Sequence, residues 1–253
     1  MTDFVHIRGS TVHAPTALEL LEVWEQGSGE SPTQRALLLL AAACPGTPRE
    51  TLVRLSIGQR DTHLLMLREL IFGSQLVSLT DCPSCSERVE LNLQTAEIRA
   101  AAQSERQPMQ EMSVGDYQVR FRLPSSEDLL VVDDDIAVGS RQLLARCIES
   151  GRRAGEECAA EELPAAVISA VSERMAVVDP LADVQLNLSC PACEHRWSTG
   201  FDIVSFLWRE IDALVRRLLR EVHVLASAYG WLEADILSLS AERRHIYLEL
   251  VGE

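Results

Sequence analysis

The sequence contains no lysine: all 23 basic residues among its 253 are arginine. This absence excludes Schiff-base chemistry, a phosphate-loop lysine and a lysine general base. Arginine pairs its planar guanidinium with carboxylates, a contact that is favoured at protein interfaces. A GC-rich genome would produce the same bias, so the missing lysine does not assign an interface by itself.

Basic residues are also few relative to acidic ones, of which there are 38, giving a formal net charge of −15. Phosphate backbones and anionic lipids repel such a chain, so we expect no nucleic-acid and no membrane partner. The longest apolar run, residues 36–44, is too short for a membrane-spanning helix, which needs about 20 residues. The first residues lack a basic stretch followed by an apolar one, so we expect no secretory signal and a cytoplasmic protein.

The common catalytic signatures are missing as well. The chain has no G-x-S-x-G, no H-E-x-x-H and no glycine loop that cradles a phosphate. The acidic run 133–135 is expected to form a solvated turn, and His63 and His223 to be packing or surface residues. We therefore predict no catalytic residues and no small-molecule substrate.

The chain does contain two matched cysteine motifs, C-P-S-C and C-P-A-C. They supply Cys82, Cys85, Cys190 and Cys193. Two thiolates spaced by two residues in a tight turn both reach one tetrahedral zinc ion, and two such turns complete a closed structural site. We therefore predict a structural Zn²⁺ held by these four cysteines. The remaining cysteines, Cys44, Cys147 and Cys158, lie alone in the sequence and are expected to be inert.

Residues that alternate between apolar and polar flank these motifs. Residues 89–93, 184–188 and 197–201 follow this pattern, which is typical of half-buried strands, as do residues 117–121. Turns that join strands in this way build a zinc ribbon. The two motifs lie 108 positions apart, and closing such a loop costs about 4 kcal/mol. Zinc binding to four thiolates contributes about 10–16 kcal/mol, so the metal outweighs the closure.

Other interpretations of the cysteine pairs stay open. A redox dithiol would place the pair at the N-terminus of a helix, whereas strand-like alternation follows both pairs here. A catalytic zinc would need an open coordination position, and His195 is the residue placed to replace one cysteine. A nucleic-acid-binding ribbon would need basic residues, but around the two motifs taken together acidic residues outnumber arginines: Asp81, Glu87, Glu90 and Glu194 against Arg88 and Arg196.

The remaining sequence is largely helical, so we predict an α+β fold. Helical N- and C-terminal segments surround a small antiparallel β zinc ribbon that carries a long insertion between its knuckles. Apolar residues recur in steps of three and four along 207–229, and Gly230 is placed to end this long helix. The apolar stripe packs within its own chain or is offered to a partner. The predicted regions are 1–78 (helical), 79–123 (first knuckle and strands), 124–180 (helical insertion, with a linker at 151–162), 181–202 (second knuckle) and 203–253 (helical).

The order of several short strings resembles a known family. They are residues 58–61, 64–69, 72–73, 82–85, 121–124, 128–129, 179–180, 190–193, 221–226, 229–231, 236–237 and 242–244. Together they resemble the zinc-ribbon baseplate hub proteins of contractile phage tails, and the closing segment is similar to short tail-assembly polypeptides. In that family a glycine often follows each second cysteine, whereas Ser86 and Glu194 stand here, so looser knuckles are expected.

The resemblance implies a non-enzymatic structural or assembly protein of a phage tail or a bacterial contractile injection system. Its expected partners are other baseplate, hub or tail-tube proteins, and its expected location is in or on the assembled particle. The alternative is a cytoplasmic zinc-ribbon protein with redox or zinc-dependent enzymatic activity.

Overall fold

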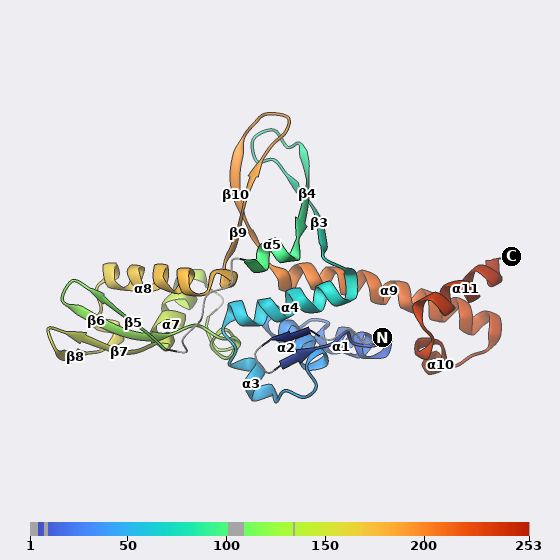
Figure 1. Cartoon of the computed structure of the whole chain (residues 1–253), viewed down its shortest axis with the longest axis horizontal. Coiled ribbons are helices and arrows are strands. Elements are labelled where there is room, and N and C mark those ends of the chain that lie inside the picture. Colours follow the sequence, from blue (N-terminus) through green and yellow to red (C-terminus); the bar gives the residue numbers. More distant parts are fainter. Residues whose placement is uncertain (1–4, 8–9, 101–108, 134, 253) are drawn as a thin grey trace. The chain divides into compact units, whose positions relative to one another are not determined.

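The computed structural model describes residues 5–7, 10–100, 109–133 and 135–252, which form two compact units. Unit 1 combines residues 1–46 with 203–253, and unit 2 spans residues 47–202. Helices and small antiparallel sheets make up both units (Figure 1), which confirms the predicted α+β class. The five predicted regions remain a prediction.

Unit 1 is a helical assembly with one short hairpin. Its strands are β1 (Val5–Ile7) and β2 (Ser10–Val12). Its helices are α1 (Ala17–Gly27), α2 (Pro32–Ala43), α9 (Ile203–Tyr229), α10 (Glu233–Ser238) and α11 (Ala241–Gly252). The predicted end of α9 is present, since Gly230 has a φ of +68° directly after it. Ser31 caps α2, because its Oγ accepts the Gln34 N–H at 3.3 Å.

Most of the apolar stripe of α9 is buried within unit 1, although its last residue, Tyr229, is exposed. Leu207, Ile211 and Leu225 are fully buried, and α9 packs against α1 and α2. The Trp24 indole N–H donates to Asp212 Oδ1 at 2.8 Å, which ties α1 to α9. Of the two alternatives for this stripe, packing within the chain is therefore correct.

Unit 2 is built around α4 (Ile57–Phe72), which follows the short helix α3 (Arg49–Val53). Two antiparallel hairpins project from it (Figure 1). The first joins β3 (Gln75–Asp81) to β4 (Arg88–Gln94) and leads into α5 (Thr95–Ala100); the second joins β9 (Val184–Ser189) to β10 (Arg196–Phe201). In register, Asp81 pairs with Arg88 and Ser189 with Arg196, so each hairpin ends at a cysteine turn. We call these two hairpins together the arm.

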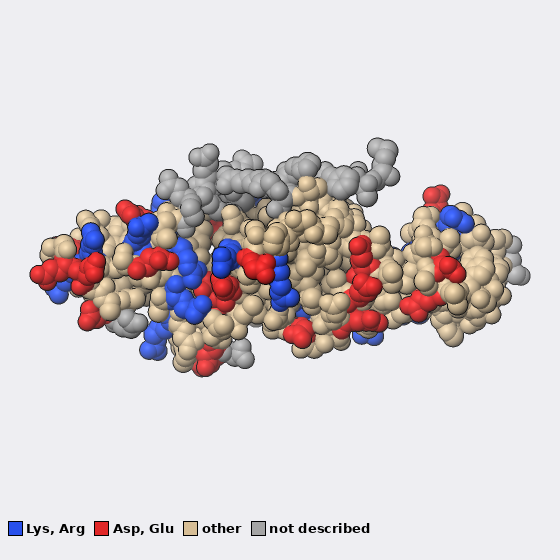
Figure 2. Space-filling model, turned by 90° about the horizontal axis from the view of Figure 1, so that it is seen from below, with Lys and Arg blue, Asp and Glu red and all other residues tan. Residues whose placement is uncertain are grey.

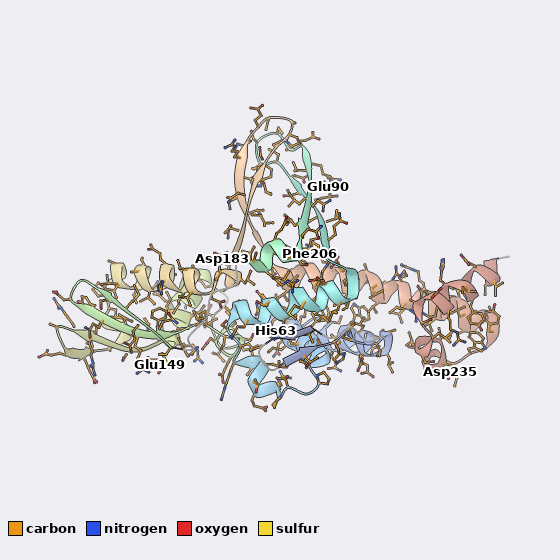
Figure 3. The ribbon with its side chains drawn as sticks, viewed as in Figure 1. His63, Glu90, Glu149, Asp183, Phe206 and Asp235 are labelled. Carbon is orange, nitrogen blue, oxygen red and sulfur yellow. The ribbon has the colours of Figure 1, made fainter. Side chains whose placement is uncertain are left out.

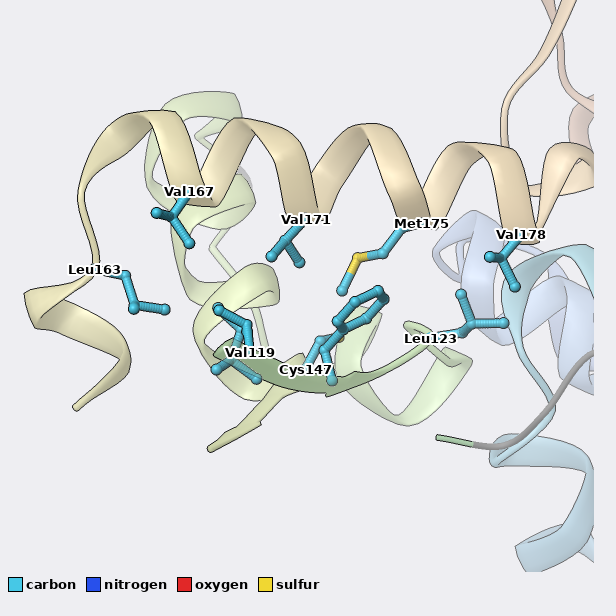
Figure 4. Close-up of a cluster of buried hydrophobic side chains, with 10 residues drawn as sticks. Val119, Leu123, Cys147, Leu163, Val167, Val171, Met175 and Val178 are labelled. Atoms are coloured by element: carbon cyan, nitrogen blue, oxygen red, sulfur yellow. The ribbon is translucent and has the colours of Figure 1, made fainter. Parts of the chain in front are cut away.

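A separate layered body lies between the two hairpins in the sequence. Its antiparallel sheet has the order β5-β6-β7-β8. Its elements are β5 (Met109–Val114), β6 (Tyr117–Arg122), α6 (Ser126–Leu129), α7 (Ile136–Cys147), β7 (Ile148–Arg153), β8 (Glu156–Cys158), η1 (Ala160–Glu162), α8 (Ala165–Val178) and η2 (Pro180–Ala182). Val171 and Met175 of α8 pack on Val119 and Phe121 of β6 (Figure 4), so α8 covers one face of the sheet.

The expected linker at 151–162 is wrong, because these residues belong to β7, β8 and η1. A tight turn with positive φ at Ala154 and Gly155 joins the two strands. Where β7 pairs with β6, the register shifts between Arg120 and Phe121. β7 therefore lacks the strict alternation of apolar and polar residues that predicts a strand from sequence. The glycines and charged residues at these positions therefore belong to a hairpin, β7–β8, at the edge of the sheet.

Candidate metal site

The two cysteine turns have the same backbone geometry. In the first, the Ser86 N–H donates to Cys82 O at 2.9 Å and the Cys82 N–H donates to Glu87 O at 2.9 Å. In the second, the Glu194 N–H donates to Cys190 O at 3.0 Å and the Cys190 N–H donates to His195 O at 2.9 Å. This common pattern turns both cysteines of each pair toward one side.

Ser86 and Glu194 both adopt a φ of +59°, in the left-handed region that favours glycine. These are the positions at which the sequence departs from the glycine of the resembling family. The two turns nevertheless keep the same backbone hydrogen bonds, and looser knuckles remain a prediction. A non-glycine residue in this conformation costs roughly 1 kcal/mol, which the rest of each turn must offset.

The four sulfur atoms converge from the two turns. All four Sγ atoms of Cys82, Cys85, Cys190 and Cys193 lie within 4.8 Å of one another. The Cys82–Cys193 distance is 3.7 Å and the Cys85–Cys190 distance is 3.6 Å. Sulfurs bound at about 2.3 Å to one tetrahedral ion would be separated by about 3.8 Å, so the arrangement fits a single metal ion.

The site has little apolar support beneath it. Cys82 and Cys190 are buried and Cys85 and Cys193 are exposed. The buried pair forms a small cluster with Val89. The partly buried side chains of Leu91 and Trp197 pack against this cluster. Because so few buried side chains join the two hairpins here, a shared metal ion would contribute most of the connection between their tips.

The thiol of Cys82 is disposed toward the thiolate form that binds metals. Burial raises its pKa, but hydrogen bonds from the backbone N–H groups of Cys85 and Ser84 outweigh that effect and lower the pKa to about 7. The pKa of Cys85 moves the opposite way, to about 12: the backbone hydrogen bond from Glu87 lowers it, but hydrogen bonding with Cys193 and burial outweigh that effect. Cys82 is therefore the easier of the two thiols to deprotonate for a metal, and Cys85 the harder.

The other sequence candidates are not members of this cluster. His195 is exposed and stacks on Trp197 with a 6.1 Å centroid separation. His63 lies within α4 (Figure 3), where Nδ1 is 2.7 Å from Gln59 O, and His223 is exposed on α9. In the part of the chain that the structure describes, the four cysteines are the group of His, Cys, Asp and Glu side chains found close enough to share a metal ion.

Among the described residues, neither the acidic run nor the remaining cysteines form such a cluster. Asp135 caps α7 by accepting the N–H groups of Ala137 and Val138, and Asp134 lies outside the described residues. Cys44 and Cys147 are buried, and burial raises the pKa of Cys147 to about 12, which agrees with an inert thiol. Cys158 is half-buried.

Two residues at the base of the arm, Gly58 and Asp179, were not among the predicted site residues. Asp179 is 1% exposed, and its Oδ2 accepts the Gly58 N–H at 2.9 Å. A Cβ atom at position 58 would overlap this carboxylate, so only glycine fits. Both residues appear in the strings that carry the family resemblance, but nothing in the sequence indicates that they touch.

Comparison with known families connects this architecture to a class of proteins. The family model described as T4 bacteriophage base plate protein matches residues 16–208. The chain belongs to this family. The match includes all four cysteines and both hairpins, and it ends within α9. No curated protein and no solved structure matches the chain.

Membership gives the chain a structural role in a phage baseplate, and so in a phage tail, among other baseplate components. Among the described residues, no helix combines the length and the apolar character needed to cross a membrane. On the face drawn in Figure 2, arginine side chains lie among aspartate and glutamate without a continuous basic surface.

Proposed function

We propose that this chain is a non-enzymatic baseplate or hub protein whose four cysteines hold one structural zinc ion. The observation that carries the proposal is the convergence of four sulfurs from turns 108 positions apart, within a chain that matches the baseplate family. Cys82, Cys85, Cys190 and Cys193 are the ligands. The proposal covers phage tails and the related bacterial contractile injection systems.

The donor set favours zinc over harder cations. Four thiolates in a closed tetrahedral arrangement suit Zn²⁺, whereas Ca²⁺ and Mg²⁺ take oxygen ligands. A site that offers no open position supplies structure and no chemistry. The ion would clamp two hairpin tips that share few buried side chains, and would hold the arm as one rigid element.

A rigid arm that projects from α4 is suited to contact a neighbouring protein. Its outer face is mixed: Val77 and Leu79 of β3 are more than half exposed, opposite Asn92 and Glu90 of β4. Figure 3 places Glu90 along β4, on the side of the arm. The proposed partners are other baseplate, hub or tail-tube proteins. The segment 209–253 lies outside the family match and is proposed as a second contact, through Ile246 and Leu250 on the exposed side of α11.

The test combines metal analysis with particle assembly. Full-length protein purified under reducing conditions should contain one zinc per chain, and Cys85→Ser should lose it. Cys158→Ser is the matched control, since Cys158 is half-buried in β8 and is not one of the four clustered cysteines. Cys85→Ser should also abolish assembly of normal particles, whereas Cys158→Ser should leave it unchanged. Normal particles from a zinc-free Cys85→Ser chain would contradict the proposal.

Deletion of the C-terminal helices is a poorer test of the second contact. Removing the chain after Ser205 would take away Leu207, Ile211 and Val215, which are part of the core of unit 1. Loss of assembly would then report unfolding. Substitution of the exposed Ile246 and Leu250 by serine leaves that core intact and tests the contact itself.

A further inference from the structure

One end of α4 carries the foot of the first hairpin. The Arg68 guanidinium donates to Gly73 O at 2.7 Å, just before β3 begins. The Thr95 N–H, directly after β4, donates to Ser74 O at 2.9 Å, and the Thr95 hydroxyl donates to Glu69 Oε2 at 3.0 Å. Both strands of this hairpin are therefore anchored at the C-terminal turn of α4.

The other end of α4 holds the segment that leads into the second hairpin. The Gly58 N–H lies in the first helical turn, where backbone donors have no partner within the helix. It donates to the carboxylate of Asp179, which lies five residues before β9 and one residue before η2. A carboxylate also interacts favourably with the positive end of the helix dipole. The foot of the second hairpin is thus docked on the N-terminal turn of the same helix.

This contact bridges a long stretch of chain. Between the end of β4 and the start of β9 the chain forms α5 and the layered body from β5 to η2. The body also touches the first turn of α4, where the Ile57 N–H donates to Pro124 O at 3.0 Å. Figure 1 shows the result: α4 lies beneath the arm, and the two hairpins converge above it.

We propose that Asp179 is a positioning residue for the metal site. Its carboxylate fixes one foot of the arm on α4 while the turn around Glu69 and Thr95 fixes the other, so the two cysteine pairs face each other before the metal binds. This inference rests on the proposed zinc site. When only a fraction of the molecules has the conformation that binds, the apparent affinity falls by that fraction. Losing the contact should therefore weaken zinc binding.

The experiment compares zinc affinities of the full-length protein and three variants. Zinc dissociation constants are measured for reduced, metal-free protein by competition with a chromophoric chelator. Asp179→Ala should bind zinc at least about tenfold more weakly than the unsubstituted protein, which corresponds to about 1.4 kcal/mol. Asp179→Asn, which keeps an acceptor oxygen for the Gly58 N–H, should recover part of the affinity.

Asp183→Ala is the matched control. Asp183 is an exposed aspartate four residues further along, near the same foot (Figure 3), and it accepts a hydrogen bond from Gln185. This variant should change the zinc affinity by less than about twofold. The cobalt-substituted forms should all show the same tetrathiolate absorption, since the four ligands are unchanged in every variant.

A second measurement separates positioning from general destabilisation. Coupling between two sites is reciprocal, so zinc should slow hydrogen exchange of the Gly58 amide in the unsubstituted protein by about the factor that Asp179→Ala costs in affinity. Whether zinc slows this exchange at all is measured on the unsubstituted protein, so it tests the positioning role even if Asp179→Ala fails to fold.

The results separate failure of the proposed zinc site from failure of the positioning role. Unsubstituted protein that binds no zinc would overturn the proposed zinc site. Zinc binding by Asp179→Ala with unchanged affinity would overturn the positioning role alone. Gly58 exchange that is insensitive to zinc would do the same.

Discussion

The Asp128 carboxylate offers a sharp test of how the layered body is held together. It is 1% exposed and accepts five hydrogen bonds. Arg122 at the end of β6 donates two, at 2.6 and 2.7 Å, and Arg146 of α7 donates one at 3.1 Å. The Ser125 N–H and hydroxyl donate the other two. One side chain therefore joins β6, α6 and α7.

Replacing Asp128 by alanine should destabilise this body by about 3 kcal/mol. Breaking a buried ion pair costs about 3–5 kcal/mol, because the partner charge is left without compensation. The side chains of Arg122 and Arg146 are 30% and 43% exposed, so water recovers part of the loss and the lower value applies. Glu127→Ala is the control: Glu127 lies next in the chain and forms an ion pair of 3.7 Å with Arg54 between two exposed side chains.

Hydrogen exchange is the suitable assay, because a chain with two compact units is not expected to unfold in one step. At pH 7, amides of β6 and α7 that exchange through opening of this body should exchange about a hundredfold faster in Asp128→Ala. Glu127→Ala should stay within about threefold of the unsubstituted protein. Equal exchange rates in the two variants would refute the reasoning.

The same carboxylate makes stability fall in acid. Burial alone would raise its pKa, but hydrogen bonds from Arg122 and Ser125 lower it well below the usual value. Asp128 therefore stabilises the folded state above its unfolded pKa of about 3.9, and this contribution is lost as the pH falls toward the folded pKa. Asp128→Asn should make the body less sensitive to pH between about 4 and 2.

Three further predictions concern unit 2. Ser86→Gly and Glu194→Gly should each stabilise the cysteine turn that contains them by about 0.5–1 kcal/mol, because both residues have a positive φ, so amide exchange at the hairpin tips should slow by about two- to fivefold; faster exchange would argue against this. Gly58→Ala should destabilise the first turn of α4 by more than about 2 kcal/mol, since its methyl group would overlap Asp179; unchanged amide exchange there would contradict it. Burial raises the pKa of Asp61 to about 6, although the adjacent Arg60 lowers it. Asp61 therefore stabilises the folded state below about pH 4, and this stabilisation is lost as the pH rises through 6. Asp61→Asn should remove this loss of stability, and an unchanged pH dependence of stability in the variant would refute the prediction.

The sequence predicted the elements whose cause is local. The alternation at 89–93, 184–188 and 197–201 corresponds to β4, β9 and β10, and α9 ends at the predicted Gly230. The C-P-x-C pairs indicated turns with converging sulfurs because the spacing alone directs both thiols to one side.

The sequence did not predict a strand whose apolar residues are exposed, or a contact between residues far apart in the chain. β3 places Val77 and Leu79 on the exposed face of its hairpin, so its apolar residues do not follow the alternation of a half-buried strand. The contact between Gly58 and Asp179 joins residues 121 positions apart, and a single sequence contains no signal for such a pair.

One zinc ion is proposed to join the two hairpin tips, and X-ray absorption spectroscopy of the full-length protein is the decisive experiment. We expect one zinc per chain, with four sulfur ligands at about 2.3 Å and no nitrogen ligand. A folded, reduced chain without metal would contradict it. So would a zinc ion whose coordination includes a histidine nitrogen such as that of His195.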